Sequence, residues 1–216
     1  MTVKFAMIGT GRIAENKLLP AMAAADGAEL WSVLSRNKAR AAKTAEAFGA
    51  KSPSPAHDDL ATLLADPDLD AVLIATPDKL HADETIAAAK AGKHVFVEKP
   101  MATSVEEAEA MVAACKEARV KLGVAYHLRW HGAQRPIHAA AHEGTFGDLR
   151  HIRVQWSSLA SDDSNWRAGT DVGKWWSLAG VGTHCLDQIL WYMTPACGDV
   201  VDVQSVISRS VWGGPN

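Results

Sequence analysis

The chain has 216 residues, of which 48% are apolar and 22% are charged, a composition typical of a globular protein with a substantial core. Lys and Arg number 22 against 25 Asp and Glu, giving a net charge of −3, and no basic stripe is present, so we expect no nucleic-acid partner. No apolar run approaches the ~20 residues that span a bilayer, and the first residues lack the hydrophobic region of a signal peptide. We therefore expect a cytoplasmic protein with no membrane partner.

Short β-rich runs alternate with alanine-rich amphipathic stretches over the first 125 residues. Strands are expected at Val3–Ile8, Glu29–Leu34, Ala71–Ala75, His94–Val97 and Lys121–Val124. Helices are expected at Ile13–Ala25, Lys38–Phe48, Asp58–Leu64, Lys79–Ala91 and Val105–Glu117, the last capped by Ser104. Such alternation is typical of βαβ units, so residues 1–125 are predicted to form an α/β domain, a doubly wound parallel sheet.

The pattern changes near residue 126, beyond which seven of the eight tryptophans lie. We expect helices and strands in turn at Gln134–Glu143, Leu149–Ser158, His184–Met193 and Val200–Trp212. Residues 126–216 are therefore predicted to be an incomplete α+β domain, for substrate and oligomerisation, with an open mixed or antiparallel sheet, because two strands alone are marginal in water. Most of the tryptophans are expected in a core, although some indole faces can stack on a sugar ring.

A glycine-rich turn joins the first expected strand to the first expected helix. The run from Gly9 to Ala14 fits the pattern G-x-G-x-x-G/A, in which the first glycine makes the turn and the second lets the backbone approach a pyrophosphate. We predict a Rossmann dinucleotide site there, with contacts from Gly9, Thr10, Gly11, Arg12 and Ile13. The alternative is a turn that only requires glycine.

The end of the second expected strand bears on the choice of cofactor. An NAD site usually has Asp or Glu there for the ribose hydroxyl, whereas this chain has Ser35 and Arg36, with Arg40 further on. A hydroxyl and guanidinium groups suit a 2′-phosphate, so NADP(H) is predicted as the preferred cofactor and NAD(H) as a possible one. If these charged residues only form the solvent-exposed first turn of the next helix, the choice between NADP(H) and NAD(H) stays open.

Two polar segments follow the expected third and fourth β-runs at the carboxyl edge of the sheet, where doubly wound folds bind ligands. One contains Thr76, Pro77 and His81, and the other is Glu98-Lys99-Pro100. Read alone, each is also compatible with a surface turn.

Taken together, the segments GTGRIA, ATPDKLH, EKP and GTHCLD resemble the glucose–fructose oxidoreductase, inositol dehydrogenase and MocA family. Among its members, the chain is most similar to NADP-dependent sugar reductases of the anhydrofructose-reductase and xylose-dehydrogenase type. The resemblance implies that Lys99 contacts nicotinamide and substrate, and that Trp166 and Arg167 lie against the cofactor. It also implies cofactor contacts at Thr76, Pro77, His81 and Glu98, and substrate contacts at Lys99, Arg129, His184 and Asp187.

One position departs from the family motif. The motif has Asp four residues before the histidine and another Asp three residues after it, and here these positions hold Gly180, His184 and Asp187. The resemblance makes the missing carboxylate part of proton transfer. His184 is still expected to relay a proton, its alternative being a helix-start histidine bonded to the backbone.

The predicted function is hydride transfer between NADP(H) and a carbonyl or hydroxyl carbon of a sugar or polyol, with Lys99 and His184 as catalytic residues. The alternative is a catalytically impaired dinucleotide sensor or structural protein. No metal is expected, because Pro136 interrupts the histidine stripe around it. The chain end at Asn216 is expected to be that of a fragment, with natural truncation and completion by a partner as alternatives; the full-length form is expected to be a homo-oligomer through its sheet.

Overall fold

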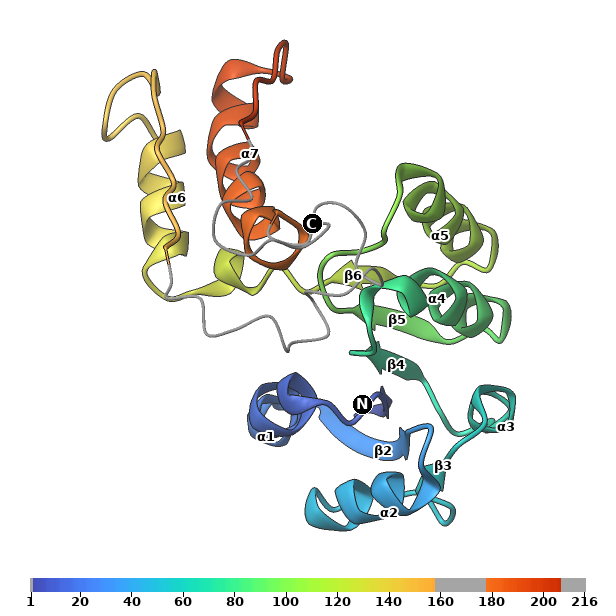
Figure 1. Ribbon diagram of the computed structural model, residues 1–216. Helices are drawn as coiled ribbons and strands as arrows, with labels where there is room; N and C mark the ends of the chain where they lie inside the picture. The colour runs from blue at the N-terminus through green and yellow to red at the C-terminus, as the bar shows by residue number, and fades with distance from the viewer. Residues whose placement is uncertain (1, 158–177, 207–216) are drawn as a thin grey trace. The chain divides into compact units, whose positions relative to one another are not determined.

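The computed structural model describes residues 2–157 and 178–206 (Figure 1). The chain divides into two units, residues 1–125 and 126–216, and each is described by itself. In the described residues, no helix has both the length and the apolar character that a membrane span requires.

Unit 1 is built on a six-stranded parallel sheet, which confirms the predicted Rossmann-type fold (Figure 1). Its strands are β1 (Val3–Ile8), β2 (Ala28–Leu34), β3 (Ala56–His57), β4 (Ala71–Ile74), β5 (His94–Val97) and β6 (Leu122–Val124). Their spatial order is β3-β2-β1-β4-β5-β6, so the chain reverses direction of winding between β1 and β4. Ligands of doubly wound sheets bind at the carboxyl edge beside that point.

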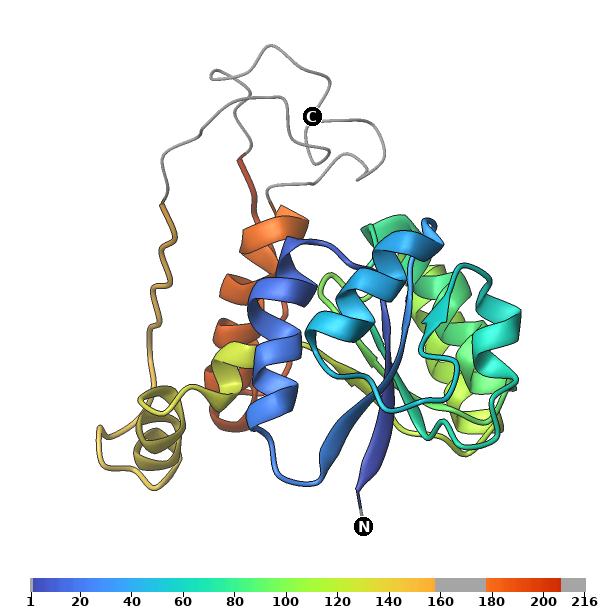
Figure 2. The same ribbon diagram turned by 90° about the horizontal axis from the view of Figure 1, so that it is seen from below.

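Helices cover both faces of this sheet (Figure 2). They are α1 (Leu19–Ala24), α2 (Lys38–Ala47), α3 (Leu60–Leu64), α4 (His81–Lys90) and α5 (Val105–Glu117). Successive strand residues point to opposite faces: Ile8 and Ile74 pack in the core under α4 and α5, whereas Met7 and Leu73 pack in the core under α1 and α2. The near-continuous apolar strands follow from this burial on both sides.

Helices α2, α3 and α5 of unit 1 begin with side-chain caps. Ser104 accepts a hydrogen bond from the backbone N–H of Glu107 at 3.2 Å, as predicted, and Asn37 accepts one from Arg40 at 3.1 Å at the start of α2. Ahead of α1, residues Ala14–Leu18 form a π-helical turn, η1. Pro20 has no N–H to continue the ladder, which accounts for the change of winding there.

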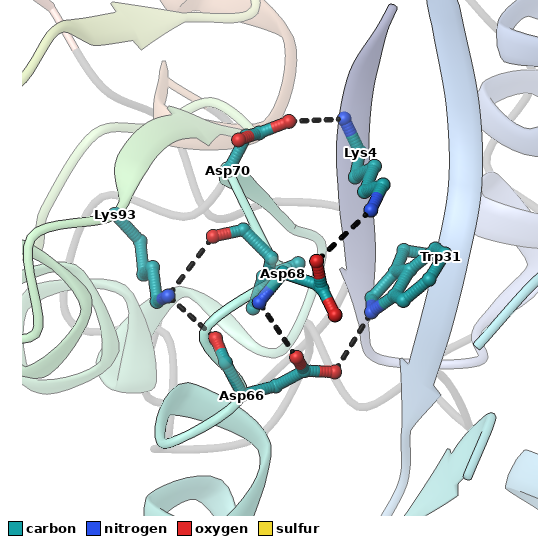
Figure 3. A network of polar contacts seen from close by, with 7 residues as sticks. Lys4, Trp31, Asp66, Asp68, Asp70 and Lys93 are labelled. Atoms are coloured by element: carbon teal, nitrogen blue, oxygen red, sulfur yellow. Dashed lines mark hydrogen bonds and ion pairs between the residues drawn. The ribbon is translucent and has the colours of Figure 1, made fainter. Parts of the chain in front are cut away.

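The amino edge of the sheet is held by a polar network (Figure 3). The Trp31 indole N–H donates to the Asp66 carboxylate at 2.7 Å, and the buried Lys93 ammonium donates to the Asp66 carbonyl at 2.6 Å. The backbone N–H of Lys4 donates to the Asp70 carboxylate at 2.9 Å. These bonds fix β1, β2 and the segment before β4 at the edge opposite the glycine turn.

Unit 2 contains a short 3₁₀ turn η3 (His127–Trp130), helix α6 (Gln134–His142), a π-helical turn η6 (Leu178–Gly182) and helix α7 (Thr183–Cys197). Helices α6 and α7 pack together: the His138 ring stacks on Trp191 with centroids 4.0 Å apart, and Tyr192 Oη donates to the Gln134 carbonyl at 3.1 Å. The two predicted helices are therefore present, and α7 continues to Cys197.

The strands predicted at Leu149–Ser158 and Val200–Trp212 are not formed in their described parts, residues 149–157 and 200–206. Valines at 201, 203 and 206 are exposed. The alternation of apolar residues predicted strands here, and the prediction is wrong for the described parts. A strand also requires a neighbouring strand for its hydrogen bonds, and neither segment has one in the described residues.

Candidate functional site

The turn after β1 has two glycines with different surroundings. Gly9 has φ +99°, and a Cβ there would lie 2.8 Å from the Ala75 carbonyl oxygen, so glycine is required by both backbone and space. A Cβ on Gly11 would meet nothing within 4 Å. The turn is therefore tight against β4 and open in front of Gly11, which fits the close approach of a ligand's phosphates to the backbone.

The helix that follows presents its start to the same open side. Arg12 is exposed and Ile13 is 43% exposed, whereas Ala14 is fully buried against the sheet. The first N–H groups of a helix carry partial positive charge and lack partners within the helix. This arrangement suits an anionic ligand.

The end of β2 is bonded to the glycine turn. Thr10 Oγ1 donates to Ser35 Oγ at 3.2 Å, and the Arg40 guanidinium donates to the Thr10 carbonyl at 2.5 Å. Arg40 thus bonds the turn itself, a contact between residues 30 positions apart in sequence that the residue pattern does not reveal. Arg36 is an exposed cation at the same end of β2.

The segment after β4 holds a half-buried acid, Glu84, that the sequence did not single out. Glu84 Oε2 accepts a hydrogen bond from Thr76 Oγ1 at 2.5 Å. Burial raises the pKa of Glu84 to about 7, while the Thr76 bond acts in the opposite direction and the neighbouring Asp83 adds to the increase. His81 lies in the same segment, and its two ring nitrogens lie 2.8 and 3.0 Å from backbone carbonyl oxygens.

Lys99 follows the last paired residue of β5 at the carboxyl edge of the sheet. The Glu98 N–H donates to the Ile74 carbonyl at 2.9 Å, and the Lys99 N–H donates to the Glu98 carboxylate at 3.1 Å. The Lys99–Pro100 peptide is cis. Because all strands are parallel, Gly9, Thr76 and Lys99 share one edge of the sheet, as predicted from the sequence.

In unit 2, His184 lies in the first turn of α7 and is 4% exposed. Three rings surround it: His127 at 4.8 Å between centroids and edge-on, Trp156 at 6.0 Å and stacked, and Tyr126 at 6.2 Å and edge-on. Tyr126 Oη lies 2.8 Å from Thr183 Oγ1, at the start of the same helix. The sequence did not reveal this ring cluster, because the histidine and the aromatic residues come from segments far apart.

The predicted substrate residues Arg129 and Asp187 are bonded to one another. Arg129 Nε donates to both oxygens of the Asp187 carboxylate at 3.0 Å, and Nη2 donates to Oδ1 at 2.6 Å. Hydrogen bonding to Asp187 raises the pKa of Arg129. Asp187 is 7% exposed, so the pair joins η3 to α7.

The remaining predicted residues divide between the units. Lys99 belongs to unit 1, and His184, Arg129 and Asp187 to unit 2. Trp166 and Arg167 lie outside the described residues. At Gly180, where the sequence motif lacks a carboxylate, a Cβ would meet no atom of the described residues within 4 Å.

The fold and the glycine turn define a dinucleotide-binding α/β domain. Residues 3–126 match the model of the oxidoreductase family with an NAD-binding Rossmann fold, GFO_IDH_MocA. The chain belongs to this family, as the sequence resemblance predicted.

Similar proteins include the 1,5-anhydro-D-fructose reductase of Ensifer adhaerens, 39% identical over 67% of this chain and 42% of that protein. The NADP(+) D-xylose 1-dehydrogenase 2 of Haloferax volcanii is 39% identical over 59% of this chain and 38% of that protein. Among solved structures, the aldose-aldose oxidoreductase of Caulobacter crescentus, complexed with glycerol, is 27% identical, with TM-score 0.79 over 89% of this chain and 58% of that one. The chain spans about half the length of the curated relatives it matches.

Proposed function

We propose that the protein to which this chain belongs transfers a hydride between a nicotinamide dinucleotide and a carbonyl or hydroxyl carbon of a sugar or polyol. The observation that carries the proposal is the glycine turn, tight at Gly9 and open at Gly11, in a chain of this oxidoreductase family. The sugar-linked activities of the reductase and dehydrogenase relatives support the substrate class.

NADP(H) is the proposed cofactor, with NAD(H) as the alternative. The exposed Arg36 and the Ser35 hydroxyl at the end of β2 suit a 2′-phosphate, and no carboxylate is present there to repel it. Gly9, Thr10, Gly11, Arg12 and Ile13 would bind the pyrophosphate, while Arg40 supports that turn through the Thr10 carbonyl. Thr76, Pro77 and Glu98 would border the nicotinamide from the edge of the sheet. The name of the xylose dehydrogenase relative supports this choice.

When bound, the nicotinamide supplies or accepts the hydride. Lys99 polarises the substrate oxygen and exchanges a proton with it, acting as an acid during reduction and as a base during oxidation. His184, in unit 2, is the second proposed proton-transfer residue, and the rings of His127, Trp156 and Tyr126 limit the access of water to it. The Arg129–Asp187 pair orients the start of α7, which carries His184. By fixing His184, the pair also helps to orient the substrate.

The partner proposed for the whole protein is a second copy of itself, joined through the sheet that residues 149–157 and 200–206 would enter, in the cytoplasm where NADP(H) is available. Extended, partly apolar segments of this kind gain hydrogen bonds by pairing with further strands.

The test is Lys99→Ala in the whole protein, with the exposed Lys90→Ala as matched control. We expect NADPH affinity within threefold of the unmodified protein, and a fall of at least a hundredfold in kcat with a panel of aldoses, ketoses and polyols. Unchanged turnover in Lys99→Ala would refute the catalytic assignment.

A dinucleotide sensor is the second candidate, favoured by the glycine at position 180, where the motif has a carboxylate. NADPH binding by the unmodified protein with no oxidation of the nucleotide by any compound of the panel would support the sensor and contradict the enzyme.

A further inference from the structure

His81 connects two loops at the carboxyl edge of the sheet. It is the first residue of α4 and is 1% exposed. Its Nδ1 lies 2.8 Å from the Pro100 carbonyl oxygen, after β5, and its Nε2 lies 3.0 Å from the Thr76 carbonyl oxygen, after β4. One buried ring thus spans the connections that follow two neighbouring strands.

Both partners of the ring are acceptors. A carbonyl oxygen cannot donate, so a ring nitrogen that bonds it must carry the proton. A doubly protonated ring makes both bonds, and a neutral ring makes one. A buried ring nitrogen without a hydrogen-bond partner is costly, so the burial of His81 opposes the loss of these contacts.

The two contacts of His81 with the Pro100 and Thr76 carbonyl oxygens, here called the His81 bridge, lie close to Lys99 and restrain the backbone on one side of it. On one side of Lys99, the Glu98 N–H is bonded to the Ile74 carbonyl of β4. On the other side, the Pro100 carbonyl is bonded to His81. The residue is therefore held from both sides to the β4 segment, and its backbone cannot shift without breaking one of these bonds.

We propose that His81 is a positioning residue that holds the Lys99–Pro100 turn against the loop after β4. This rests on the proposed function for its link to catalysis, since it gives Lys99 a defined place relative to cofactor and substrate. The family resemblance implies a cofactor contact for His81, but the ring is buried and its nitrogens face carbonyls. Its effect is transmitted through the backbone.

The variant that tests the proposal is His81→Gln, which keeps a polar side chain but whose single amide nitrogen cannot reach both carbonyls. The matched control is His57→Gln, since His57 is also a buried histidine of the same sheet, 8% exposed at the end of β3. Both variants are made in the whole protein. The measurements are backbone hydrogen exchange, NADPH affinity, and kcat and KM separately.

We expect hydrogen exchange across residues 98–103 to increase at least tenfold in His81→Gln and less than threefold in His57→Gln, with β1 protected in both. We also expect kcat to fall at least tenfold in His81→Gln while KM and NADPH affinity change less than threefold. Unchanged exchange across residues 98–103, or an equal loss of kcat in both variants, would overturn the proposal.

Two further readouts separate the possible failures. If Lys99→Ala retains full turnover but His81→Gln increases hydrogen exchange across residues 98–103, the proposed function is refuted and the positioning role of His81 is supported. If His81→Gln does not fold, NMR of the unmodified protein labelled with ¹⁵N-histidine decides: a ring N–H of His81 that persists in water supports the bridge, and a ring N–H that exchanges within seconds overturns it.

Discussion

Arg129 and Asp187 form a bidentate ion pair that links two segments 58 residues apart in the chain. The Asp187 carboxylate is buried, while the Arg129 side chain is 42% exposed. The loss of one partner therefore has a different energetic cost for each residue. A buried carboxylate that loses its cation keeps its desolvation penalty, whereas an exposed guanidinium that loses its anion is solvated by water.

Removal of the cation is therefore the more informative change. We expect Arg129→Ala to lower the free energy of unfolding by about 2–3 kcal/mol, because Asp187 is left buried without its donor. The exposed pair Arg150–Asp148, at 2.8 Å, provides the control: Arg150→Ala is expected to cost about 0–1 kcal/mol. Urea unfolding of both variants measures the difference, and equal costs would show that burial of Asp187 does not matter.

Glu84 predicts a dependence of stability on pH. Its pKa of about 7 in the folded chain lies above the ordinary value of 4.5, so the folded state holds a proton that the unfolded state has lost between these values. Stability is then expected to decrease as the pH rises from about 4.5 to about 7 and to level off above that, with a contribution on the order of 2–3 kcal/mol.

The isosteric variant Glu84→Gln stays neutral and should remove this slope. We expect it to be more stable than the unmodified chain at pH 8 and to differ little from it at pH 4.5. The exposed Glu46→Gln on α2 is the control and should leave the slope in place. A slope that persists in Glu84→Gln would show that another group titrates in this range.

Substitutions at the two glycines of the turn are expected to affect different properties, stability at Gly9 and cofactor affinity at Gly11. Gly9→Ala places a Cβ 2.8 Å from a backbone oxygen at a positive φ, so we expect a loss of about 1–3 kcal/mol of stability. Gly11→Ala meets no atom within 4 Å and should change stability by less than about 0.5 kcal/mol. If a pyrophosphate approaches this position, the same methyl should weaken NADPH binding at least tenfold, measured by titration calorimetry. Unchanged affinity in Gly11→Ala would place the cofactor elsewhere.

The backbone of unit 1 was largely predictable, since β1 (Val3–Ile8) and α5 (Val105–Glu117) have the bounds that their apolar pattern and cap predicted. Strand β3 was missed because two residues carry no periodic pattern. Side-chain contacts at the site were not predictable in the same way. The bonds from Arg40 to the glycine turn and from His81 to Pro100 depend on how distant segments meet, which local pattern does not encode.

Cofactor selectivity is expected to depend on Arg36. Arg36→Asp replaces an exposed cation with an anion where a 2′-phosphate would lie, so we expect NADPH affinity to fall by about 1.5–3 kcal/mol, at least tenfold, with NADH affinity little changed. The same reversal at Lys43, exposed on α2, controls for overall charge. Equal affinities of the unmodified protein for NADPH and NADH would refute this selectivity.

Gly180 offers a direct test of whether the chain has lost a proton-transfer group. The family motif has a carboxylate four residues before the histidine, a spacing that places the two side chains on one face of a helix. A Cβ at Gly180 would lie within 4 Å of no atom of the part of the chain that the structure describes, so packing in that part does not exclude Gly180→Asp. Residues Leu178–Gly182 form a π-helical turn before α7, and replacing a glycine there reduces the freedom of the unfolded chain.

We therefore expect Gly180→Asp in the whole protein to fold with stability within about 1 kcal/mol of the unmodified protein. We also expect kcat to rise at least threefold, because a carboxylate beside His184 stabilises the protonated ring during proton transfer. Gly180→Asn has the same size without the charge and should leave kcat unchanged. Equal effects of Asp and Asn would mean that side-chain volume at this turn, not its charge, alters the reaction, and a fall in kcat with Asp alone would indicate that the catalytic route of this protein does not use a carboxylate here.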